Sequence, residues 1–230
     1  MSYEGQHKQD LFIDKILLNR KWEGTFVEIG AYNGVGFSNT YFFEKERGWS
    51  GICIEPIPER FARLSENRAC ICINGCISSE SGKMKFTWAE GNAEMLSGLT
   101  NKYDKEHIAR IDRELAEYGG KKHEIDVDCY KLDELLKKYN MTKVDYCSID
   151  VEGAEYDILS SVNWREVDIK SFTVENNYDD PQIRSLMRSN GYSFIGKLDC
   201  DDVYVKTNNI FESFILKSKL KKFKKEHNIL

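Results

Sequence analysis

The sequence predicts a doubly wound α/β fold whose mostly parallel, seven-stranded sheet ends in an antiparallel hairpin. From residue 25 onward, short apolar runs alternate with segments of helical periodicity. The apolar runs are nearly continuous, which is typical of strands buried on both faces of a parallel sheet. The last two runs are separated only by a short acidic turn at 199–202, which indicates a hairpin at the sheet edge.

The first part of the chain supplies alternating helices and strands. Apolar residues at helical spacing predict a leading helix over 9–20, which ends near 22–24. The pattern then predicts strand 25–30, helix 38–47, strand 51–55, helix 58–67 and strand 70–76. Residues 82–88 alternate between apolar and polar side chains, as expected for an additional strand.

A charged stretch over 91–122 interrupts this pattern. It contains a predicted helix near 107–118, which Gly119 and Gly120 end. Long insertions in compact domains often form lids or binding loops, so we assign this stretch to substrate access. A solvated surface excursion is the alternative. The order then resumes with helix 132–139, strand 144–149, helix 153–162, strand 171–174, helix 181–190 and strands 192–197 and 203–206.

Composition predicts a single ordered domain over 1–206, followed by a basic tail over 207–230. A net charge of −5 gives no overall attraction to nucleic acid or to an anionic membrane. The seven cysteines include no C-x-x-C pair, so we expect neither a disulfide framework nor a zinc site. We expect a reducing, cytoplasmic setting and no membrane insertion, because no apolar run approaches about 18 residues.

Two strand-end carboxylates indicate the cofactor. Strand 25–30 carries Glu28 and opens into a turn with Gly30 and Gly34, whereas strand 51–55 ends in Glu55. This turn departs from the G-x-G-x-x-G pattern of dinucleotide sites, and its carboxylate would repel a pyrophosphate. A carboxylate there attracts an ammonium or sulfonium group, and Glu55 is placed to accept the hydroxyls of a ribose. The pattern favours S-adenosylmethionine over NAD.

A second group of acids follows two later strands. Asp150, Glu152 and Glu155 come after strand 144–149, and Glu175 and Asn176 come after strand 171–174. Ligands of open α/β sheets lie beyond the carboxyl ends of the strands, so these groups should converge beside the cofactor. Crowded carboxylates raise one another's pKa and provide a proton acceptor, unless a cation lies between them. Both outcomes suit methylation of a hydroxyl, and capping of the next helix is the structural alternative.

The oxygen donors of this group define the predicted metal site. Asp150, Glu175 and Asn176 would suit Mg²⁺ or Mn²⁺ better than zinc.

These motifs resemble those of the FkbM family of S-adenosylmethionine-dependent methyltransferases. The similarity lies in Phe-Val-Glu-Ile-Gly-Ala-Tyr-Asn-Gly at 26–34, Ile-Glu-Pro at 54–56, Ser-Ile-Asp-Val-Glu-Gly-Ala-Glu at 148–155 and Val-Glu-Asn at 174–176. The sheet and its hairpin likewise resemble the class I, Rossmann-like methyltransferase fold. The resemblance implies methyl transfer to a hydroxyl of a sugar, a glycan or a sugar-bearing small molecule.

The resemblance also implies roles for individual residues. Glu28, Gly30 and Asn33 would line the methionine end of the cofactor, Glu55 the ribose, and residues 76–78 the adenine, while Asp150 and Glu152 would face the transferring methyl group as catalytic residues. The full predicted cofactor set is Gln9, Glu28, Gly30, Ala31, Asn33, Gly34, Ser38, Glu55, Pro56, Cys76, Ile77, Ser78 and Asp150. The strand ends are also similar to TylF-type metal-dependent sugar O-methyltransferases, where an Asp more often stands at the position of Asn176.

Two further functions stay open at this stage. The lysine-rich tail could grip phosphates for methylation of RNA, or the enzyme could methylate a protein. Nucleic acid is the less favoured acceptor because the chain has no Asn/Asp-Pro-Pro-type clamp for a base. A non-catalytic, cofactor-binding scaffold that docks a glycosyltransferase is the other alternative. The carboxylates kept at two strand ends argue against it.

Overall fold

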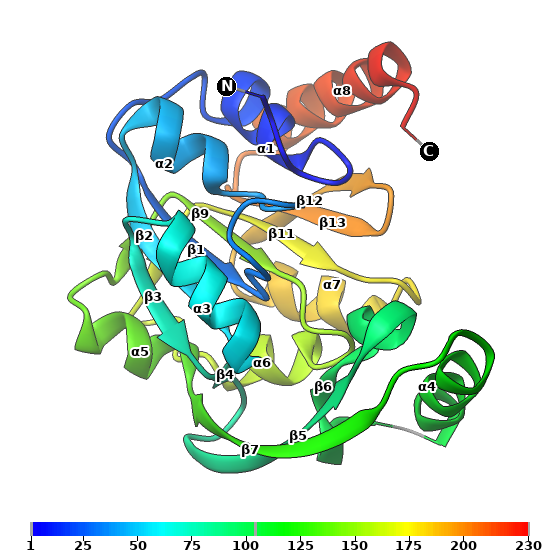
Figure 1. Ribbon diagram of the computed structural model, residues 1–230. Coiled ribbons are helices and arrows are strands. Elements are labelled where there is room, and N and C mark those ends of the chain that lie inside the picture. Colours follow the sequence, from blue (N-terminus) through cyan, green and yellow to red (C-terminus); the bar gives the residue numbers. More distant parts are fainter. Residues whose placement is uncertain (1, 104, 230) are drawn as a thin grey trace.

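The computed structural model describes residues 2–103 and 105–229, and it is built on the predicted seven-stranded sheet (Figure 1). Across the sheet the strand order is β12-β13-β11-β9-β1-β2-β3. Neighbours from β11 to β3 pair in parallel, whereas β13 is antiparallel to both β11 and β12. The strands are β1 (Thr25–Ile29), β2 (Ser50–Glu55), β3 (Ile71–Asn74), β9 (Tyr146–Ile149), β11 (Ser171–Glu175), β12 (Tyr192–Leu198) and β13 (Asp201–Lys206). The predicted fold class and its terminal hairpin are confirmed.

Helices cover both faces of this sheet. Successive side chains of a strand point to opposite faces, so a continuous apolar strand needs cover on both. On one face, Val27 of β1 lies in an apolar core with α5 (Leu132–Lys138), α6 (Glu155–Ser161) and α7 (Pro181–Ser189). On the other face, Phe26 lies in a second core with α1 (Gln9–Phe12), the π-helical turn η1 (Ile13–Leu17), α2 (Tyr41–Arg47), α3 (Pro58–Asn67) and α8 (Ile210–His227). Both side chains are fully buried, which explains the near-continuous apolar runs.

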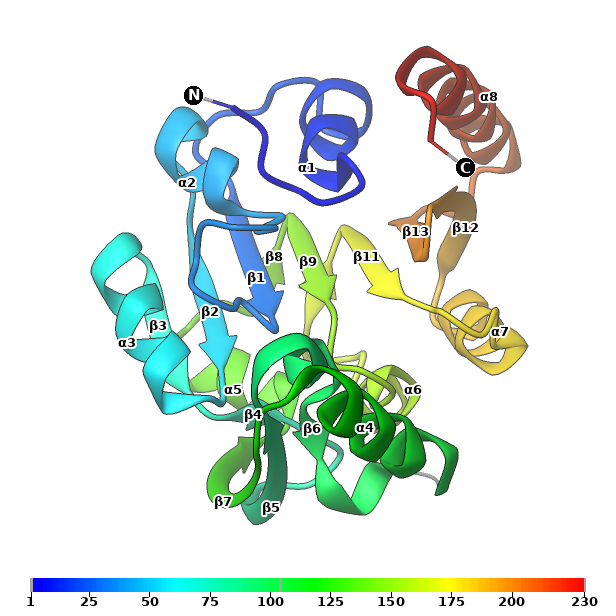
Figure 2. The same ribbon diagram turned by 45° about the vertical axis from the view of Figure 1, so that its right-hand side comes forward.

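A second sheet stands beyond the carboxyl ends of the central strands (Figure 2). Its order is β4-β7-β5-β6, with strands β4 (Cys76–Ile77), β5 (Gly82–Ala89), β6 (Gly98–Leu99) and β7 (Lys122–Tyr130). The single strand predicted over 70–76 is therefore wrong in extent, because β3 ends at Asn74 and Cys76 pairs with β7. Strand β7 has no counterpart in the sequence prediction, although Ile125, Val127 and Cys129 alternate with acidic residues.

The segment between β5 and β7 folds beside this second sheet. It contains the 3₁₀ turns η2 (Gly91–Leu96) and η3 (Thr100–Lys102) and the helix α4 (Lys105–Tyr118), which confirms the helix predicted near 107–118. Ala93, Leu96 and Ile111 form a small apolar cluster with Ala89 of β5. A short parallel pair, β8 (Lys143–Val144) and β10 (Asp168–Ile169), completes the strands.

The C-terminal helix α8 packs against the second core. Leu216, Leu220 and Phe223 are buried there, and the Phe223 ring lies 5.2 Å from that of Phe12. Gly196 of β12 makes room for this helix, because a Cβ atom at Gly196 would lie 2.6 Å from Cδ2 of Leu220. Within the described residues, no helix combines the length and apolar character needed to span a bilayer.

Candidate active site

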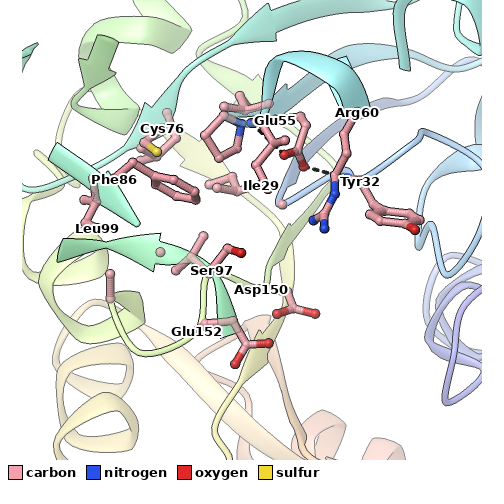
Figure 3. A pocket seen from close by; sticks show the side chains of 18 of the residues that line it. Ile29, Tyr32, Glu55, Arg60, Cys76, Phe86, Ser97, Leu99, Asp150 and Glu152 are labelled. Carbon is pink, nitrogen blue, oxygen red and sulfur yellow. Dashed lines mark hydrogen bonds between the residues drawn. The ribbon is translucent and has the colours of Figure 1, made fainter. Parts of the chain in front are cut away.

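Three neighbouring cavities open at the carboxyl ends of the central strands, and Asp150 and Met95 line all three. The apolar cavity lies between β1, β2 and the second sheet and encloses about 730 Å³, part of it open to solvent (Figure 3). The N-terminal cavity lies under Gln6 and His7. The acidic cavity is bounded by Glu152, Glu175 and residues of α4. A ligand that reached all three cavities would pass Asp150.

The apolar cavity is shaped around Glu55 at the end of β2. The Glu55 carboxylate accepts hydrogen bonds from the backbone N–H groups of Tyr32 and Ile57, both at 2.9 Å. Burial raises the pKa of Glu55 to about 7, although Arg60 and these N–H groups oppose the shift. The Arg60 guanidinium lies 4.7 Å from the centre of the Tyr32 ring, as Figure 3 shows. A buried acceptor thus lies beside an aromatic ring and a cation.

The rest of this cavity is an apolar slot. Phe86 of β5 and Leu99 of β6 form one wall, and Ile57 and Cys76 lie nearby, all four buried. A flat, uncharged ring would fit between such walls, with its attached hydroxyls near Glu55. The apolar cavity therefore suits an adenosine group.

The Glu28 carboxylate is hydrogen-bonded and ion-paired to other residues of the protein. Its carboxylate accepts hydrogen bonds from Ser38 Oγ at 2.7 Å, the Asn39 backbone N–H at 2.6 Å and Thr40 Oγ1 at 2.6 Å. Arg68, the residue that follows α3, lies 3.3 Å away as its buried counter-ion. Glu28 therefore holds the loop after β1 against α3 and leaves only part of its surface to the N-terminal cavity.

One acceptor of the N-terminal cavity has no partner. Asn39 donates its side-chain N–H to Ser148 Oγ, but its Oδ1 atom is buried and accepts no hydrogen bond within the described residues. A buried, unpaired acceptor costs free energy unless a ligand donates to it. An ammonium group is such a donor, so this cavity suits the methionine end of S-adenosylmethionine.

The structure brings most of the predicted cofactor residues together around two of the cavities. Around the apolar cavity lie Gly30, Glu55, Pro56, Cys76, Ile77 and Asp150, and around the N-terminal cavity lie Gln9, Glu28, Gly30, Ala31, Ser38 and Asp150. Gly30 has φ +85°, and a Cβ atom there would lie 2.0 Å from the carbonyl oxygen of Asp150. This glycine is what allows the ends of β1 and β9 to touch.

Three predicted cofactor residues lie outside these cavities. Asn33 accepts hydrogen bonds from the N–H groups of Val35 and Gly36 and so closes the turn after β1. The carbonyl oxygen of Gly34 accepts from Arg68. Ser78 is buried where β4 meets β7, and its backbone N–H donates to Tyr130. In this structure the three residues support the loops that carry the site.

The predicted catalytic residues Asp150 and Glu152, in the loop after β9, lie beside Glu175, the last residue of β11. One oxygen each of Asp150, Glu152 and Glu175 lie within 4.8 Å of one another. Burial, followed by the charges of Glu175 and Glu155, raises the pKa of Glu152 to about 9. Burial and Glu175 also raise the pKa of Asp150 well above its usual value. Within the described residues, the Asp150 and Glu152 carboxylates accept no hydrogen bond and form no ion pair that would offset the burial and repulsion that raise their pKa values.

The loop after β9 is held in a special conformation. Glu152 has φ +57°, which is uncommon for a residue other than glycine. Glu155, the first residue of α6, accepts hydrogen bonds from the N–H groups of Val151 and Gly153. Glu155 thus holds the backbone of this loop in the conformation that places Glu152 among the residues lining the cavity (Figure 3).

Asn176 lies apart from these three carboxylates. Its Oδ1 atom accepts from the Asp180 N–H at 2.7 Å, and its Nδ2 donates to Asp202 at 3.0 Å. The Asn176 amide therefore holds the loop before α7. The carboxylates that the structure groups together are Asp150 and Glu175 of the predicted metal set, with Glu152 in place of the amide.

Several cavity residues are absent from the sequence prediction. Arg60 and Tyr32 flank Glu55, while Phe86 and Leu99 cover the apolar slot. Tyr103 and Arg110, from the 91–122 segment, line the acidic cavity. Alternation over 82–88 marked Phe86 as an inward-facing strand residue, but nothing in the local sequence shows that this strand leaves the main sheet and covers the site.

The strand order, the single reversed strand and the acids at the ends of β1 and β2 define a class I, Rossmann-like methyltransferase. The family model described as "Methyltransferase FkbM domain" matches residues 28–194. This chain belongs to the FkbM family, whose members are S-adenosylmethionine-dependent methyltransferases. The family predicted from the sequence is confirmed.

Individual relatives are distant. The chain is 25% identical over 190 residues to Methyltransferase sdnD of Sordaria araneosa, an overlap that covers 72% of each chain. It is 24% identical over 206 residues to Methyltransferase 1 of Beauveria bassiana, which covers 81% of this chain and 80% of the relative. A solved structure of Methyltransferase FkbM from Methylobacillus flagellatus is similar with a TM-score of 0.48 and 11% identity, covering 80% of this chain and 43% of that one. The chain thus spans less than half of that protein.

The Glu28 and Arg68 pair gives a first testable prediction. Arg68→Ala should lower the free energy of unfolding by about 3 kcal/mol or more, because it leaves the buried Glu28 without its counter-ion. Arg63→Ala, at an exposed position of α3, should change it by less than about 0.5 kcal/mol. Urea unfolding measures both, and equal effects would contradict the structural role of Arg68.

A second prediction concerns stability and pH. Because the pKa of Glu152 rises from an ordinary 4.5 to about 9 on folding, its carboxyl group destabilises the fold increasingly as pH rises through this range. Glu152→Gln should therefore raise Tm at pH 8 by about 3 °C or more but change it little at pH 5. Differential scanning fluorimetry measures this. Glu66→Gln, at an exposed position of α3, should show no such pH dependence, and a Glu152→Gln effect that is independent of pH would contradict the assignment.

Proposed function

We propose that this protein is an S-adenosylmethionine-dependent O-methyltransferase that methylates a hydroxyl group of a sugar, a glycan or a sugar-bearing small molecule. The observation that carries the proposal is the convergence of Asp150, Glu152 and Glu175 where the apolar and acidic cavities meet. An alcohol is a poor nucleophile near pH 7, so the protein must supply a proton acceptor in contact with the acceptor hydroxyl.

The cofactor half of the site follows from the fit of the cavities. We assign the adenine to the slot between Ile57, Phe86 and Leu99, and the ribose hydroxyls to the buried carboxylate of Glu55. Asn39 Oδ1 and Gln9 would receive the methionine end. When bound, the cofactor supplies a methyl group that its sulfonium has already activated.

The protein's own residues then handle the proton. We assign the role of general base to Glu152, because its carboxylate lines both cavities and accepts no hydrogen bond within the described residues. Asp150, at the junction, would share the proton released by the hydroxyl, and Glu155 would keep the loop in place. Burial, followed by charge repulsion from Glu175, makes Glu152 a stronger base than an ordinary carboxylate.

The acceptor side supports a polyhydroxylated ligand. The acidic cavity encloses about 1690 Å³, part of it open to solvent, and carries polar groups such as Asn177 and Lys102 beside the rings of Tyr103 and Tyr156. Aromatic faces beside hydrogen-bonding groups suit sugars, which expose both C–H and O–H groups. Residues 95–110 of the segment 91–122 contribute much of this wall, which supports the proposed role of that segment in substrate access.

The alternatives find less support. The lysines of the C-terminal tail belong to α8, which stands at the opposite end of the molecule from α4 and the second sheet (Figures 1 and 2). They would not guide RNA into the site. The carboxylates of Asp150 and Glu152 point into the cavity, as a catalytic protein requires (Figure 3). A glycosyltransferase partner, cytoplasmic localisation and domain boundaries at residue 206 stay predictions from the sequence.

The test is a methyl-transfer assay across nucleotide sugars and glycans, with the methylated position fixed by NMR. Glu152→Gln should lower kcat by about 100-fold or more, the usual contribution of a general base, while isothermal titration shows unchanged affinity for S-adenosylmethionine. Because the base must be deprotonated, wild-type kcat/KM should rise with pH toward the pKa of about 9.

Glu175→Gln is the control for the origin of that pH dependence. Removing the Glu175 charge should move the rise in kcat/KM to lower pH, since this charge helps to hold the pKa of Glu152 high. Unchanged turnover in Glu152→Gln would remove this residue from the base role. Absence of S-adenosylmethionine binding by the wild type would overturn the proposed function altogether.

Removal of metal ions separates the base mechanism from a cation-assisted one. Asp150, Glu152 and Glu175 are oxygen donors of the kind that Mg²⁺ and Mn²⁺ prefer, and such an ion would also lower the pKa of a bound hydroxyl. With Glu152 as base, we expect kcat to survive exhaustive treatment with EDTA. Loss of activity that added Mg²⁺ or Mn²⁺ restores would instead assign these carboxylates to a metal site.

A further inference from the structure

The C-terminal helix α8 has two apolar sides, of which only one is covered. Ser213, Leu216, Leu220 and Phe223 form its inner side and are buried against the core. On the outer side Ile210, Phe211, Phe214 and Ile215 are 88%, 72%, 70% and 38% exposed. These four residues fall within about 140° of the helix circumference, opposite the buried side. Exposed apolar patches of this kind mark interaction surfaces.

The second half of the same outer side is basic. Lys221, Lys222 and Lys225 are exposed and continue the line of the apolar residues along the helix. Lys217, Lys219 and Lys224 flank them, and Glu212 and Glu226 are the only acids of the helix. The chain as a whole carries −5, so this positive charge is local to α8.

We propose that the outer side of α8 docks the protein onto an anionic lipid bilayer. Phenylalanine and isoleucine side chains gain free energy when they enter the boundary between headgroups and acyl chains. Lysines beside them attract acidic headgroups, and their long stems let the charged amines stay at the phosphate level. The helix would lie flat on the membrane, since none of the described helices is able to cross it.

Charge and shape favour an anionic bilayer on this surface over RNA and over a second copy of the chain. RNA would use the lysines, but it offers nothing to Ile210 and Ile215, whose aliphatic side chains do not stack on bases as aromatic rings do. A second copy packed through α8 would place lysines against lysines or against the apolar half, so neither arrangement pairs opposite charges. A lipid surface satisfies both halves at once.

The inference is independent of the acceptor proposed above. In both ribbon views α8 stands away from α4 and the second sheet, which cover the cavities (Figures 1 and 2). Membrane binding through α8 would therefore leave the mouth of the active site open. The surface would attach the enzyme to a bilayer through α8, while the cavities lie at the carboxyl ends of the central strands.

The experiment is vesicle flotation with the full chain. Vesicles of phosphatidylcholine with about one third phosphatidylserine should carry the wild type upward, whereas pure phosphatidylcholine vesicles should bind it weakly. Phe211→Ser/Phe214→Ser should lower the partition coefficient about tenfold or more, as should Lys221→Glu/Lys225→Glu. All four positions are exposed, so Tm should stay unchanged.

Controls distinguish the other occupants. Ile108→Ser/Tyr118→Ser removes two exposed apolar side chains from α4 and should leave flotation unchanged. Equal flotation of the wild type and the Phe211→Ser/Phe214→Ser variant would overturn the proposal, as would no flotation with phosphatidylserine vesicles. Light scattering that shows a dimer lost on Phe211→Ser/Phe214→Ser, without vesicle binding, would assign the surface to self-association. RNA binding that depends on the lysines but not on the phenylalanines, without flotation, would assign it to nucleic acid.

Discussion

The buried pair of Glu28 and Arg68 is the interaction on which the rest of the site depends. Glu28 takes three hydrogen bonds from residues 38–40, and Arg68 binds Glu28 while also donating to the carbonyl of Gly34. The loop after β1 is thereby fixed at both ends against α3. That loop carries Tyr32 and Asn39, which shape the apolar and N-terminal cavities. Arg68 also pairs with Glu44 at 2.9 Å, so the charges that are buried beside the predicted cofactor half satisfy one another.

The predicted acceptor half of the site differs, because its charges have no counter-ions in the described residues. Asp150, Glu152 and Glu175 lie together with no cation paired to them in the described residues, and burial raises the pKa of the first two. Such a group is unfavourable for folding, so the surrounding structure must hold it in place. Glu155 does this through the backbone of the loop. In the proposed mechanism, this unfavourable crowding of acids would give Glu152 the basicity needed to accept a proton from an alcohol.

The sequence predicted those features that depend on neighbouring residues along the chain. Glu55 is an example, because its place at the end of β2 and its hydrogen bond from the Ile57 N–H depend on neighbouring residues of the chain. Glu28 shows the limit: its place was predicted, but its engagement by Arg68 depends on a residue 40 positions away. The amide of Asn176 is likewise engaged by Asp180, four residues along the chain, and by Asp202, a contact that only the folded hairpin creates. Strand β7 was missed although its alternation is clear, because a charged insertion concealed a second sheet.

Helix α8 shows why a basic tail is easily misinterpreted. Because apolar residues lie on both of its sides, the helix does not look amphipathic from its sequence, which therefore resembles a charged, solvated segment. Leu216, Leu220 and Phe223 nevertheless bury one side against the fold, with Gly196 making room for them. A helix fixed in this way holds Phe211 and Phe214 in water at a free-energy cost that a flexible tail could avoid by rotating. An external surface that buries these rings would remove that cost, which is the physical reason to expect a partner there.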